Sequence, residues 1–181
     1  MTTWIALLRG INVGSHNRVA MQDLRRMCER LGLEEVKTLL NSGNVVFRSG
    51  ERDAARLERL LEQETEKRLG VKPAYFLRTA DEWAKVVKRN PFPDAAARDP
   101  GHLLAVLMRR PPRREAVAAL RAAIPGRELV EVRGREAYFV YPDGIGRSKL
   151  TAALVEKHLG GAGTARNWNT VLKLLALTKP E

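Results

Sequence analysis

The chain has 181 residues, of which 44% are hydrophobic and 29% charged, and its formal net charge at pH 7 is +11. This length can bury one sizeable core or two small fused ones, and the composition excludes a disordered chain. No apolar run approaches the roughly 20 residues that cross a bilayer, and the first residues lack the features of a signal peptide. The single cysteine, Cys28, excludes an internal disulfide. We therefore expect a cytoplasmic protein without a membrane partner.

The positive charge is the strongest compositional signal, with a sequence pI of about 10.4. It favours acidic partners such as nucleic acid or phosphorylated small molecules. Arginine outnumbers lysine 23 to 9, however. Such an excess also arises when arginine is spread over the whole surface, so charge alone does not define a binding site.

The first half of the chain alternates strand-like and helix-like segments. An apolar strand, Trp4–Arg9, is followed by apolar residues at helical spacing from Met21 to Leu31. Two strand-like runs, at 36–40 and 45–48, flank the turn 41–44, and glycine and asparagine tolerate the positive φ that a hairpin needs. The rest of this half is predicted as a helix over 57–68, a strand over 74–77 and a helix with Thr79 as its N-cap.

The second half repeats this order. Its predicted elements are a strand over 103–108, a helix after Pro111-Pro112, a hairpin of strands 129–133 and 137–141, a helix capped by Ser148, an extended piece over 164–167, and a last helix over about 169–177 with Asn169 or Thr170 as its cap. The residues of the two halves scarcely match, so the repetition rests on the order of elements.

This order predicts an α+β fold of two fused ferredoxin-like (βαββαβ) units with mainly antiparallel sheets, each followed by an extra helix. The expected division is a first half over 1–90, a linker over 91–101, where prolines accumulate, and a second half over 102–181.

Four polar blocks stand out in the sequence, at 9–18, 41–44, 141–150 and 164–170. The first and third combine glycines with a following helix start, where backbone N–H groups can face an anion. Neither block has the spacing of a dinucleotide-binding or phosphate-loop motif. An ordinary loop, a hairpin turn and a capped helix remain the alternatives for the first three blocks.

The segments Arg9-Gly10-Ile11-Asn12-Val13-Gly14, Asn41-Ser42-Gly43-Asn44-Val45-Val46-Phe47, Gly144-Ile145-Gly146-Arg147-Ser148-Lys149-Leu150 and Thr164-Ala165-Arg166-Asn167-Trp168-Asn169-Thr170 resemble the signature blocks of a bacterial family known as domain of unknown function 1697. The resemblance runs nearly end to end and implies a pair of ferredoxin-like halves, but no established activity. It makes the polar blocks the candidate ligand site. The candidate ligand-binding residues are Arg9, Asn12, Gly14, Asn41, Asn44, Arg147, Ser148, Lys149, Arg166 and Asn167.

A basic cluster in the second half is independent of the four blocks. Its members, Arg109, Arg110, Arg113 and Arg114, surround the predicted start of the helix after Pro111-Pro112. Cations there oppose the helix dipole by a few tenths of a kcal/mol each, roughly, and a bound phosphate would reverse that sign. The alternative is that these arginines only solvate the surface.

Three classes of function stay open. Binding of an anionic small molecule or of nucleic acid is favoured first, although the strands 4–8 and 103–107 lack the mid-strand aromatics on which RNA-recognition domains stack bases. The second class is an enzyme acting on a phosphorylated small molecule, with Ser15, Ser42 or Ser148 as possible nucleophiles and the catalytic residues unknown. The third is a ligand-sensing or interaction protein. The three histidines are widely separated in the sequence, so we expect no metal and no cofactor.

Overall fold

The computed structural model describes residues 1–180. Within them the chain divides into two compact units. Unit 1 comprises residues 1–85 and the residues from Lys173 onward, and unit 2 comprises residues 86–172. The stretch 91–101, expected as a linker, holds a short helix, α4 (Pro93–Arg98), and the start of a 3-10 turn, η1 (Pro100–His102). The division at 90 and 102 stays a prediction.

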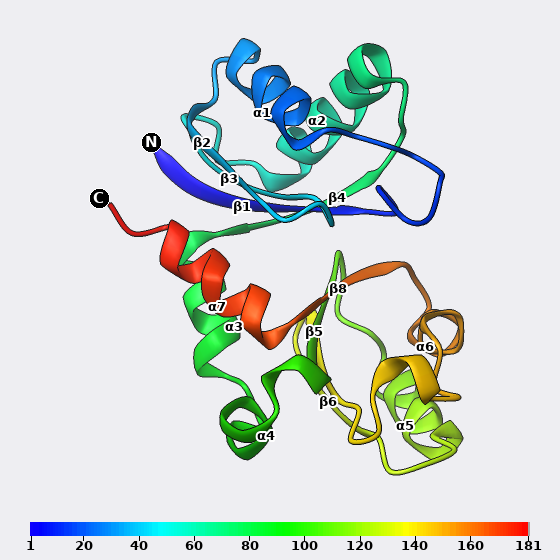
Figure 1. The fold of residues 1–181 in the computed structure, drawn as a ribbon. Helices are drawn as coiled ribbons and strands as arrows, with labels where there is room; N and C mark the ends of the chain where they lie inside the picture. Colours follow the sequence, from blue (N-terminus) through cyan, green and yellow to red (C-terminus); the bar gives the residue numbers. More distant parts are fainter. Residues whose placement is uncertain (181) are drawn as a thin grey trace. The chain divides into compact units, whose positions relative to one another are not determined.

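Unit 1 is built on a four-stranded antiparallel sheet with the order β2-β3-β1-β4. Its strands are β1 (Thr2–Arg9), β2 (Glu34–Leu39), β3 (Asn44–Ser49) and β4 (Ala74–Thr79). Helices α1 (Met21–Arg30) and α2 (Ala54–Leu69) cover one face of the sheet (Figure 1), and α3 (Ala80–Lys88) follows β4.

The core of unit 1 follows from the alternation of side chains along β1. Trp4, Ala6 and Leu8 pack into one cluster with residues of both helices, such as Leu24 and Leu61. Ile5 and Leu7, which point to the opposite face of the sheet, are also buried. Burial on both faces explains why this strand reads as a continuous apolar run.

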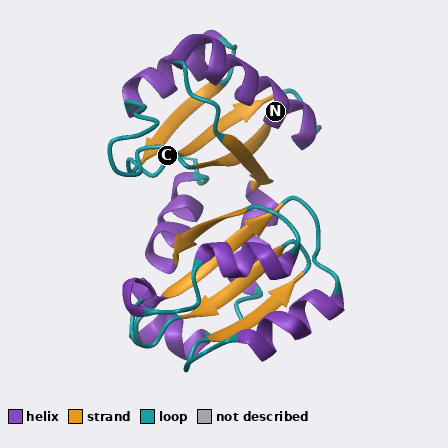
Figure 2. Cartoon of the chain, turned by 90° about the vertical axis from the view of Figure 1, so that its right-hand side faces the viewer, coloured by secondary structure: helices purple, strands orange, loops and turns teal. Residues whose placement is uncertain are grey.

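Unit 2 has the same arrangement, with the strand order β6-β7-β5-β8. Its strands are β5 (Leu103–Met108), β6 (Leu129–Arg133), β7 (Glu136–Val140) and β8 (Gly163–Asn167). Its helices are α5 (Arg114–Ala123), α6 (Ala152–Leu159) and the first part of α7 (Trp168–Leu177). Figure 2 shows the strands of each unit side by side with helices against the sheet. Leu120, Phe139 and Leu150 lie at the centre of the second core.

The two sheets also agree in register. Ile5 pairs with Arg78 across β1 and β4, and Ala105 pairs with Arg166 across β5 and β8. In this register Leu8 corresponds to Met108. Both donate their backbone N–H at 2.9 Å to the hairpin beside them, Leu8 to the carbonyl of Gly43 and Met108 to that of Arg135.

The predicted α+β class is confirmed, with two four-stranded antiparallel sheets and seven α-helices within residues 1–180. Thr79 caps α3 as predicted, because its hydroxyl accepts from the N–H of Glu82, whose carboxylate accepts from the N–H of Thr79. No helix in the described part of the chain combines the length and the apolar character that a membrane span requires.

Two predicted helix caps are wrong. Helix α6 begins three residues later than expected, and Thr151, not Ser148, caps it by accepting from the N–H of Leu154. Helix α7 begins at Trp168, and its cap is Asn167, whose side chain accepts from the N–H of Thr170. In both places several small polar residues in a row can act as a cap, so the sequence alone does not choose among them.

Candidate anion-binding surface

The first two polar blocks come together at one corner of unit 1, where β1 ends and the β2–β3 hairpin turns. The Asn12 side chain makes the connection. Its amide nitrogen donates to the carbonyl of Asn41 at 2.7 Å and to that of Val19 at 2.9 Å, and its oxygen accepts from the N–H of Val19 at 2.8 Å. Three bonds from one side chain hold two loops that are 29 residues apart in the sequence.

These bonds give the asparagines of the corner structural roles. Asn44 is fully buried, and its amide group donates to the carbonyl of Leu39 and to the hydroxyl of Ser42. Asn12 adopts a positive φ of 53°, which asparagine tolerates better than most residues. Asn41 and Gly14 are exposed at the rim of the corner. These hydrogen bonds therefore hold the loops of the corner together. They leave fewer polar groups available to bind the predicted ligand than the sequence suggested.

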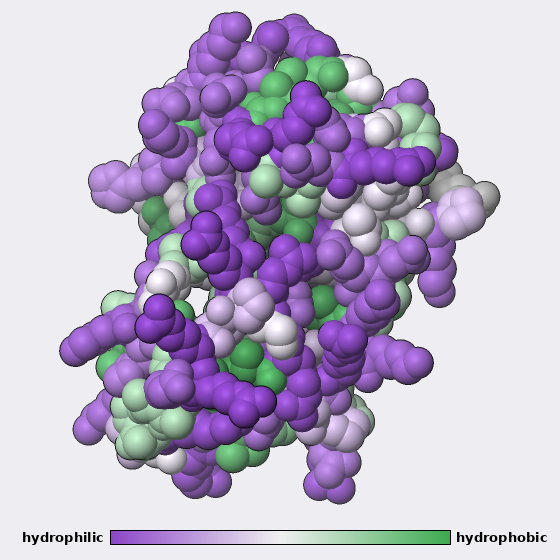
Figure 3. Space-filling view, turned by 180° about the vertical axis from the view of Figure 1, so that it is seen from behind, coloured by the Kyte–Doolittle hydropathy of each residue, from purple (hydrophilic) through white to green (hydrophobic). Residues whose placement is uncertain are grey.

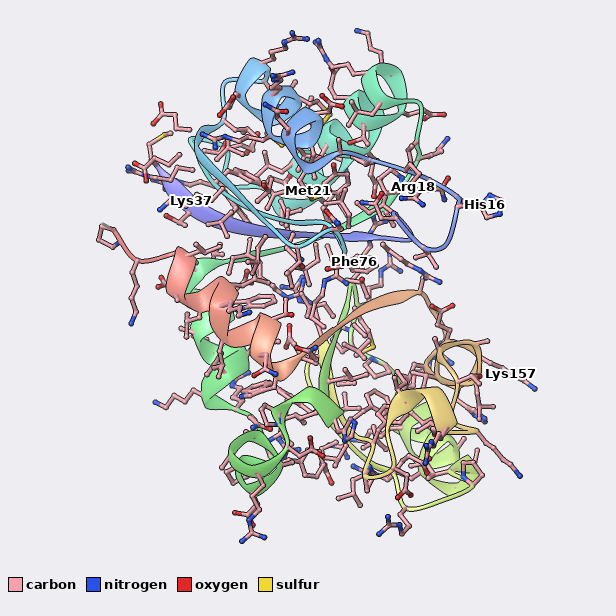
Figure 4. The ribbon with its side chains drawn as sticks, in the orientation of Figure 1. His16, Arg18, Met21, Lys37, Phe76 and Lys157 are labelled. Atoms are coloured by element: carbon pink, nitrogen blue, oxygen red, sulfur yellow. The ribbon has the colours of Figure 1, made fainter. Side chains whose placement is uncertain are left out.

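The cations of this corner differ in exposure. Arg9, at the end of β1, is half-buried and engaged in interactions. His16 and Arg18 are exposed (Figure 4), and they extend from the loop that precedes α1. The N-terminus of α1 has no side-chain cap.

The third block lies at the start of α6 in unit 2. The Ser148 hydroxyl donates to a carboxylate oxygen of Glu128 and accepts from the N–H of Leu150. The other oxygen of Glu128 is buried with no hydrogen-bond partner within residues 1–180. Burial, aided by the charge of Glu128, raises the pKa of Tyr141 to about 12. Arg147 and Lys149 are exposed on either side of Ser148.

The fourth block spans β8 and the start of α7. The Arg166 guanidinium is buried and donates to the hydroxyl of Thr164 and to the carbonyl of Ala165, both at 2.8 Å. Burial lowers the pKa of Arg166 to about 10, so it stays charged at neutral pH. Trp168, directly after β8, is buried in the core. Arg166 and Asn167 thus have structural bonds that the sequence did not reveal.

Blocks three and four share one end of the sheet in unit 2. Val140, at the end of β7, pairs with Leu103, and Asn167, at the end of β8, pairs with Leu104. Both strands therefore finish beside the start of β5, where α6 and α7 begin. Convergence of all four blocks on one ligand stays a prediction.

The predicted basic cluster is exposed at the opposite end of β5. Arg109 and Arg110 follow that strand, and Arg113 and Arg114 lie at the uncapped N-terminus of α5. The side chains of Arg110, Arg113 and Arg114 form no hydrogen bond or ion pair among residues 1–180. Hydrophilic residues cover most of the face seen in Figure 3, so polar surface is not confined to this cluster.

Two further arginines extend this cluster, and the sequence reasoning missed them. Arg133 and Arg135 occupy the β6–β7 hairpin, and the carbonyl of Arg135 accepts from Met108, directly before Arg109. Arg133 lies 3.3 Å from Glu131, so its charge is partly balanced. The signal was present in the order of elements, because a βαββαβ unit places the hairpin turn beside the end of its first strand, here 103–108. We call the six residues Arg109, Arg110, Arg113, Arg114, Arg133 and Arg135 the arginine corner.

Unit 1 also contains an open groove of about 940 Å³ that holds no predicted site residue. It lies between α1, the β2–β3 edge and residues 177–180. Its arginines Arg25 and Arg48 form ion pairs with Glu29 and Glu35 at 2.8 and 2.7 Å. Because both of its arginines are already ion-paired, this groove is a poorer anion site than the arginine corner.

The side chains that usually bind metals do not gather in the described part of the chain. Residues 1–180 contain no group of three or more His, Cys, Asp or Glu that could hold a metal ion. Burial raises the pKa of the Cys28 thiol to about 12, so Cys28 is a core residue in its protonated form. The closest His–carboxylate pair, His102 with Asp99 at 2.6 Å, is exposed beside η1.

The fold and the arginine corner define a basic α+β protein with a repeated order of elements. A family model described as "Protein of unknown function (DUF1697)" matches residues 1–138, and the chain belongs to this family, as the signature blocks predicted. The solved structure of the conserved bacterial protein SP0830 from Streptococcus pneumoniae is similar, with a TM-score of 0.74 and 23% identity over 98% of this chain and 99% of that one. That likeness shows a shared fold. No curated protein matches the chain.

Proposed function

We propose that this protein binds a phosphate-bearing polyanion, and the backbone of nucleic acid in the first place, through the arginine corner of unit 2. One observation carries the proposal: Arg110, Arg113 and Arg114 are exposed, lack acidic partners within residues 1–180, and surround the N-terminus of α5. Each cation there opposes the helix dipole, whereas a phosphate would be stabilised by the dipole and the guanidinium groups together.

The surface suits the backbone of nucleic acid better than its bases. Arginine binds phosphate oxygens in a bidentate manner, and each phosphate neutralised releases condensed counterions. Tyr138, an aromatic residue of β7, is buried, and its hydroxyl donates to the carbonyl of Val86 at 2.6 Å. It is therefore not available for base stacking. We expect binding that depends strongly on salt and weakly on sequence.

A small phosphorylated ligand is the second candidate. It is favoured by the exposed Arg147 and Lys149 at the start of α6, beside the glycines of the third block. The glycine-rich loops and the remaining candidate residues would then bind that small ligand. An enzyme acting on such a ligand would need a general base to activate its nucleophile. If Ser148 were that nucleophile, the Glu128 carboxylate, to which its hydroxyl donates, would be the base.

The test measures binding of a fluorescently labelled DNA duplex of mixed sequence to the full chain. For the wild type we expect log K to fall linearly with log salt between about 50 and 200 mM. In the double variant Arg110→Ala with Arg113→Ala, the slope of log K against log salt should be shallower by about two. Binding at the lower salt should be at least about tenfold weaker.

The matched control is Arg25→Ala with Arg26→Ala on α1, where both arginines are exposed but paired with Glu29 and Asp23. It removes the same charge and should change the slope far less. If the two double variants lose affinity equally, binding follows net charge alone and the arginine corner is not the site. If the salt slope is unchanged in both, the proposal fails.

We also propose that each unit is a ferredoxin-like split β-α-β fold and that the pair arose by duplication. The common strand order, the matching register and the equivalent hydrogen bonds of Leu8 and Met108 support this origin. A cytoplasmic location is part of the proposal and is supported by the single, buried, reduced cysteine.

A further inference from the structure

A histidine–carboxylate pair lies in unit 2 directly before β5 begins. Nδ1 of His102 and a carboxylate oxygen of Asp99 are 2.6 Å apart, and the two side chains are 44% and 55% exposed. The turn η1 holds the two residues together, because the N–H of His102 donates to the carbonyl of Asp99 at 3.1 Å. Asp99 stands at the N-cap position of η1, but its carboxylate does not cap the turn. Neither capping nor core packing therefore accounts for the pair.

The carboxylate determines which ring nitrogen of His102 carries the proton. An ionised carboxylate can only accept a hydrogen bond, so Nδ1 of His102 donates its proton to Asp99. In the neutral ring, Nε2 then keeps its lone pair. Nε2 has no hydrogen bond or ion pair among residues 1–180. A lone pair on a ring that a carboxylate orients is the arrangement of a general base or a nucleophile.

The backbone places Nε2 of His102 against the third polar block. The carbonyl of His102 accepts from the N–H of Tyr141 at 2.9 Å, so His102 lies beside the end of β7. Gly144 has a φ of +82°, and a Cβ there would lie 3.4 Å from Nε2 and 4.0 Å from Cε1 of His102. These two ring atoms are the only atoms within 4 Å of that position, apart from the residues adjacent to Gly144 in the chain. The glycine therefore leaves space beside the ring nitrogen that keeps its lone pair.

The charged residues near this pair in the sequence favour an anionic ligand. Arg98 directly precedes the pair, and Arg147 and Lys149 belong to the third block; all three are exposed. Their side chains form no hydrogen bond or ion pair within residues 1–180. The carboxylate of the third block, Asp143, is ion-paired with Arg127. The charge of Asp143 is thus balanced, whereas the charges of the three cations are not, and a phosphate group would meet attraction.

We propose that Nε2 of His102 accepts a phosphoryl group from a small phosphoryl donor, such as an acyl phosphate or phosphoramidate, bound at the third block. The Nε2 lone pair forms the new bond to phosphorus while the bond from phosphorus to the leaving group breaks, and the electron pair of that bond departs with the leaving group. The ring keeps its Nδ1 proton and becomes positively charged, and Asp99 stabilises that charge. The proposal deepens the second candidate function and is separate from DNA binding, because the arginine corner lies at the other end of β5.

The first measurement is the tautomer of each neutral imidazole in the full chain, read from proton–nitrogen correlation spectra. His16 and His158 are the internal controls, because neither has a carboxylate partner within residues 1–180. We expect the proton on Nδ1 in His102 and mainly on Nε2, the form that free imidazole side chains prefer, in the two controls. Asp99→Asn removes the charged acceptor and should make the spectrum of His102 resemble those of the controls.

The second measurement is the rate of phosphorylation by phosphoramidate, followed by phosphorus NMR and assigned to residues by mass spectrometry. We expect the wild type to react at His102 at least about tenfold faster than at His16 or His158. Asp99→Asn should lower the rate at His102 at least about tenfold. The matched control Asp143→Asn also removes one carboxylate, from the third block, and should change that rate by less than about twofold.

A neutral reagent separates the nucleophilic character of His102 from the attraction of phosphate. The double variant Arg147→Ala with Lys149→Ala removes two cations of the third block. It should slow the reaction of His102 with phosphoramidate at least about threefold, because the donor is an anion. Its reaction with diethyl pyrocarbonate, which is uncharged, should stay at the rate of the wild type.

Three results would overturn the proposal: a proton on Nε2 in neutral His102, equal phosphorylation rates at the three histidines, or an unchanged rate at His102 in Asp99→Asn. An unchanged phosphoramidate rate in Arg147→Ala with Lys149→Ala would overturn the assignment of a phosphoryl donor to the third block. If Asp99→Asn fails to fold, the tautomers and the relative rates within the wild-type chain decide.

Discussion

The loops that follow β1 in unit 1 and β5 in unit 2 lie at equivalent places in the two sheets. Their polar and charged residues, however, have different roles. In unit 1 the corner has a long loop and a hairpin turn of four residues, 40–43, joined by the side chain of Asn12. In unit 2 the hairpin turn has two residues, Gly134 and Arg135, and the connection to α5 is short and rich in arginine. The first corner uses its polar groups to hold itself together, whereas the second has the exposed side chains of Arg110, Arg113 and Arg114 before and at the start of α5.

The same contrast explains why the conspicuous polar blocks are not all equally good candidates. Residues such as Asn12 and Asn44 are already hydrogen-bonded within unit 1, so a ligand would have to compete with those bonds. The guanidinium groups of Arg113 and Arg114 have no such partners within residues 1–180, so binding a phosphate would break no side-chain hydrogen bond.

The largest expected effect is on the free energy of unfolding, and it distinguishes the hairpin turn of unit 1 from that of unit 2. Gly43 has a φ of +85°, and a Cβ there would lie 2.6 Å from Ile11 Cδ1 and 2.9 Å from Leu8 Cβ. Gly43→Ala should lower the free energy of unfolding by about 3 kcal/mol, from backbone strain and overpacking together. Gly134 also has a positive φ but open space around it, so Gly134→Ala should cost about 1 kcal/mol. Urea unfolding measures both, and equal costs would show that the corner of unit 1 is not tightly packed.

A smaller effect is expected at β4, the edge strand of unit 1, where the backbone N–H groups of Tyr75 and Leu77 donate at 3.0 Å to Glu62 and Glu58 of α2. Glu58→Ala with Glu62→Ala removes both acceptors from β4 and should cost about 2 kcal/mol, with faster exchange of the Tyr75 and Leu77 amides. Gln63→Ala, on an exposed position of the same helix, is the control and should change neither quantity by much. Unchanged exchange in the double variant would mean that the carboxylates do not protect this edge.

The smallest effect concerns one residue that differs between the turns. Leu40, 50% exposed, has a φ of +58°, and in the matching register Gly134 has a φ of +63° at the same place. Leu40→Gly should therefore stabilise unit 1 by less than about 1 kcal/mol, because relief of the left-handed strain is partly offset by the flexibility of glycine in the unfolded chain. Thermal unfolding of the variant and the wild type measures the difference, and destabilisation would contradict this account.

The fold was largely predictable because its signals are local and repeated. Strand 103–108 and strand 129–133 have the predicted bounds, and the family assignment is confirmed. The order of elements was visible in apolar periodicity even though the residues of the two halves differ.

The roles of the polar residues were harder to predict, because they depend on contacts distant in sequence. The bond between Asn12 and Asn41 spans 29 residues, and that between Ser148 and Glu128 spans 20. The cap of α6 was misplaced because Ser148 and Thr151 are chemically similar and only the Glu128 contact distinguishes them.

The path of the chain has a consequence for how this protein is made. Residues 173–177, the final turns of α7, belong to unit 1, and Leu177 and Thr178 lie with Thr3 and Val46 along the groove of that unit. A ribosome therefore completes all of unit 2 before it delivers the last piece of unit 1. The middle of the polypeptide can reach its native state during synthesis, whereas the part synthesised first must wait for the part synthesised last.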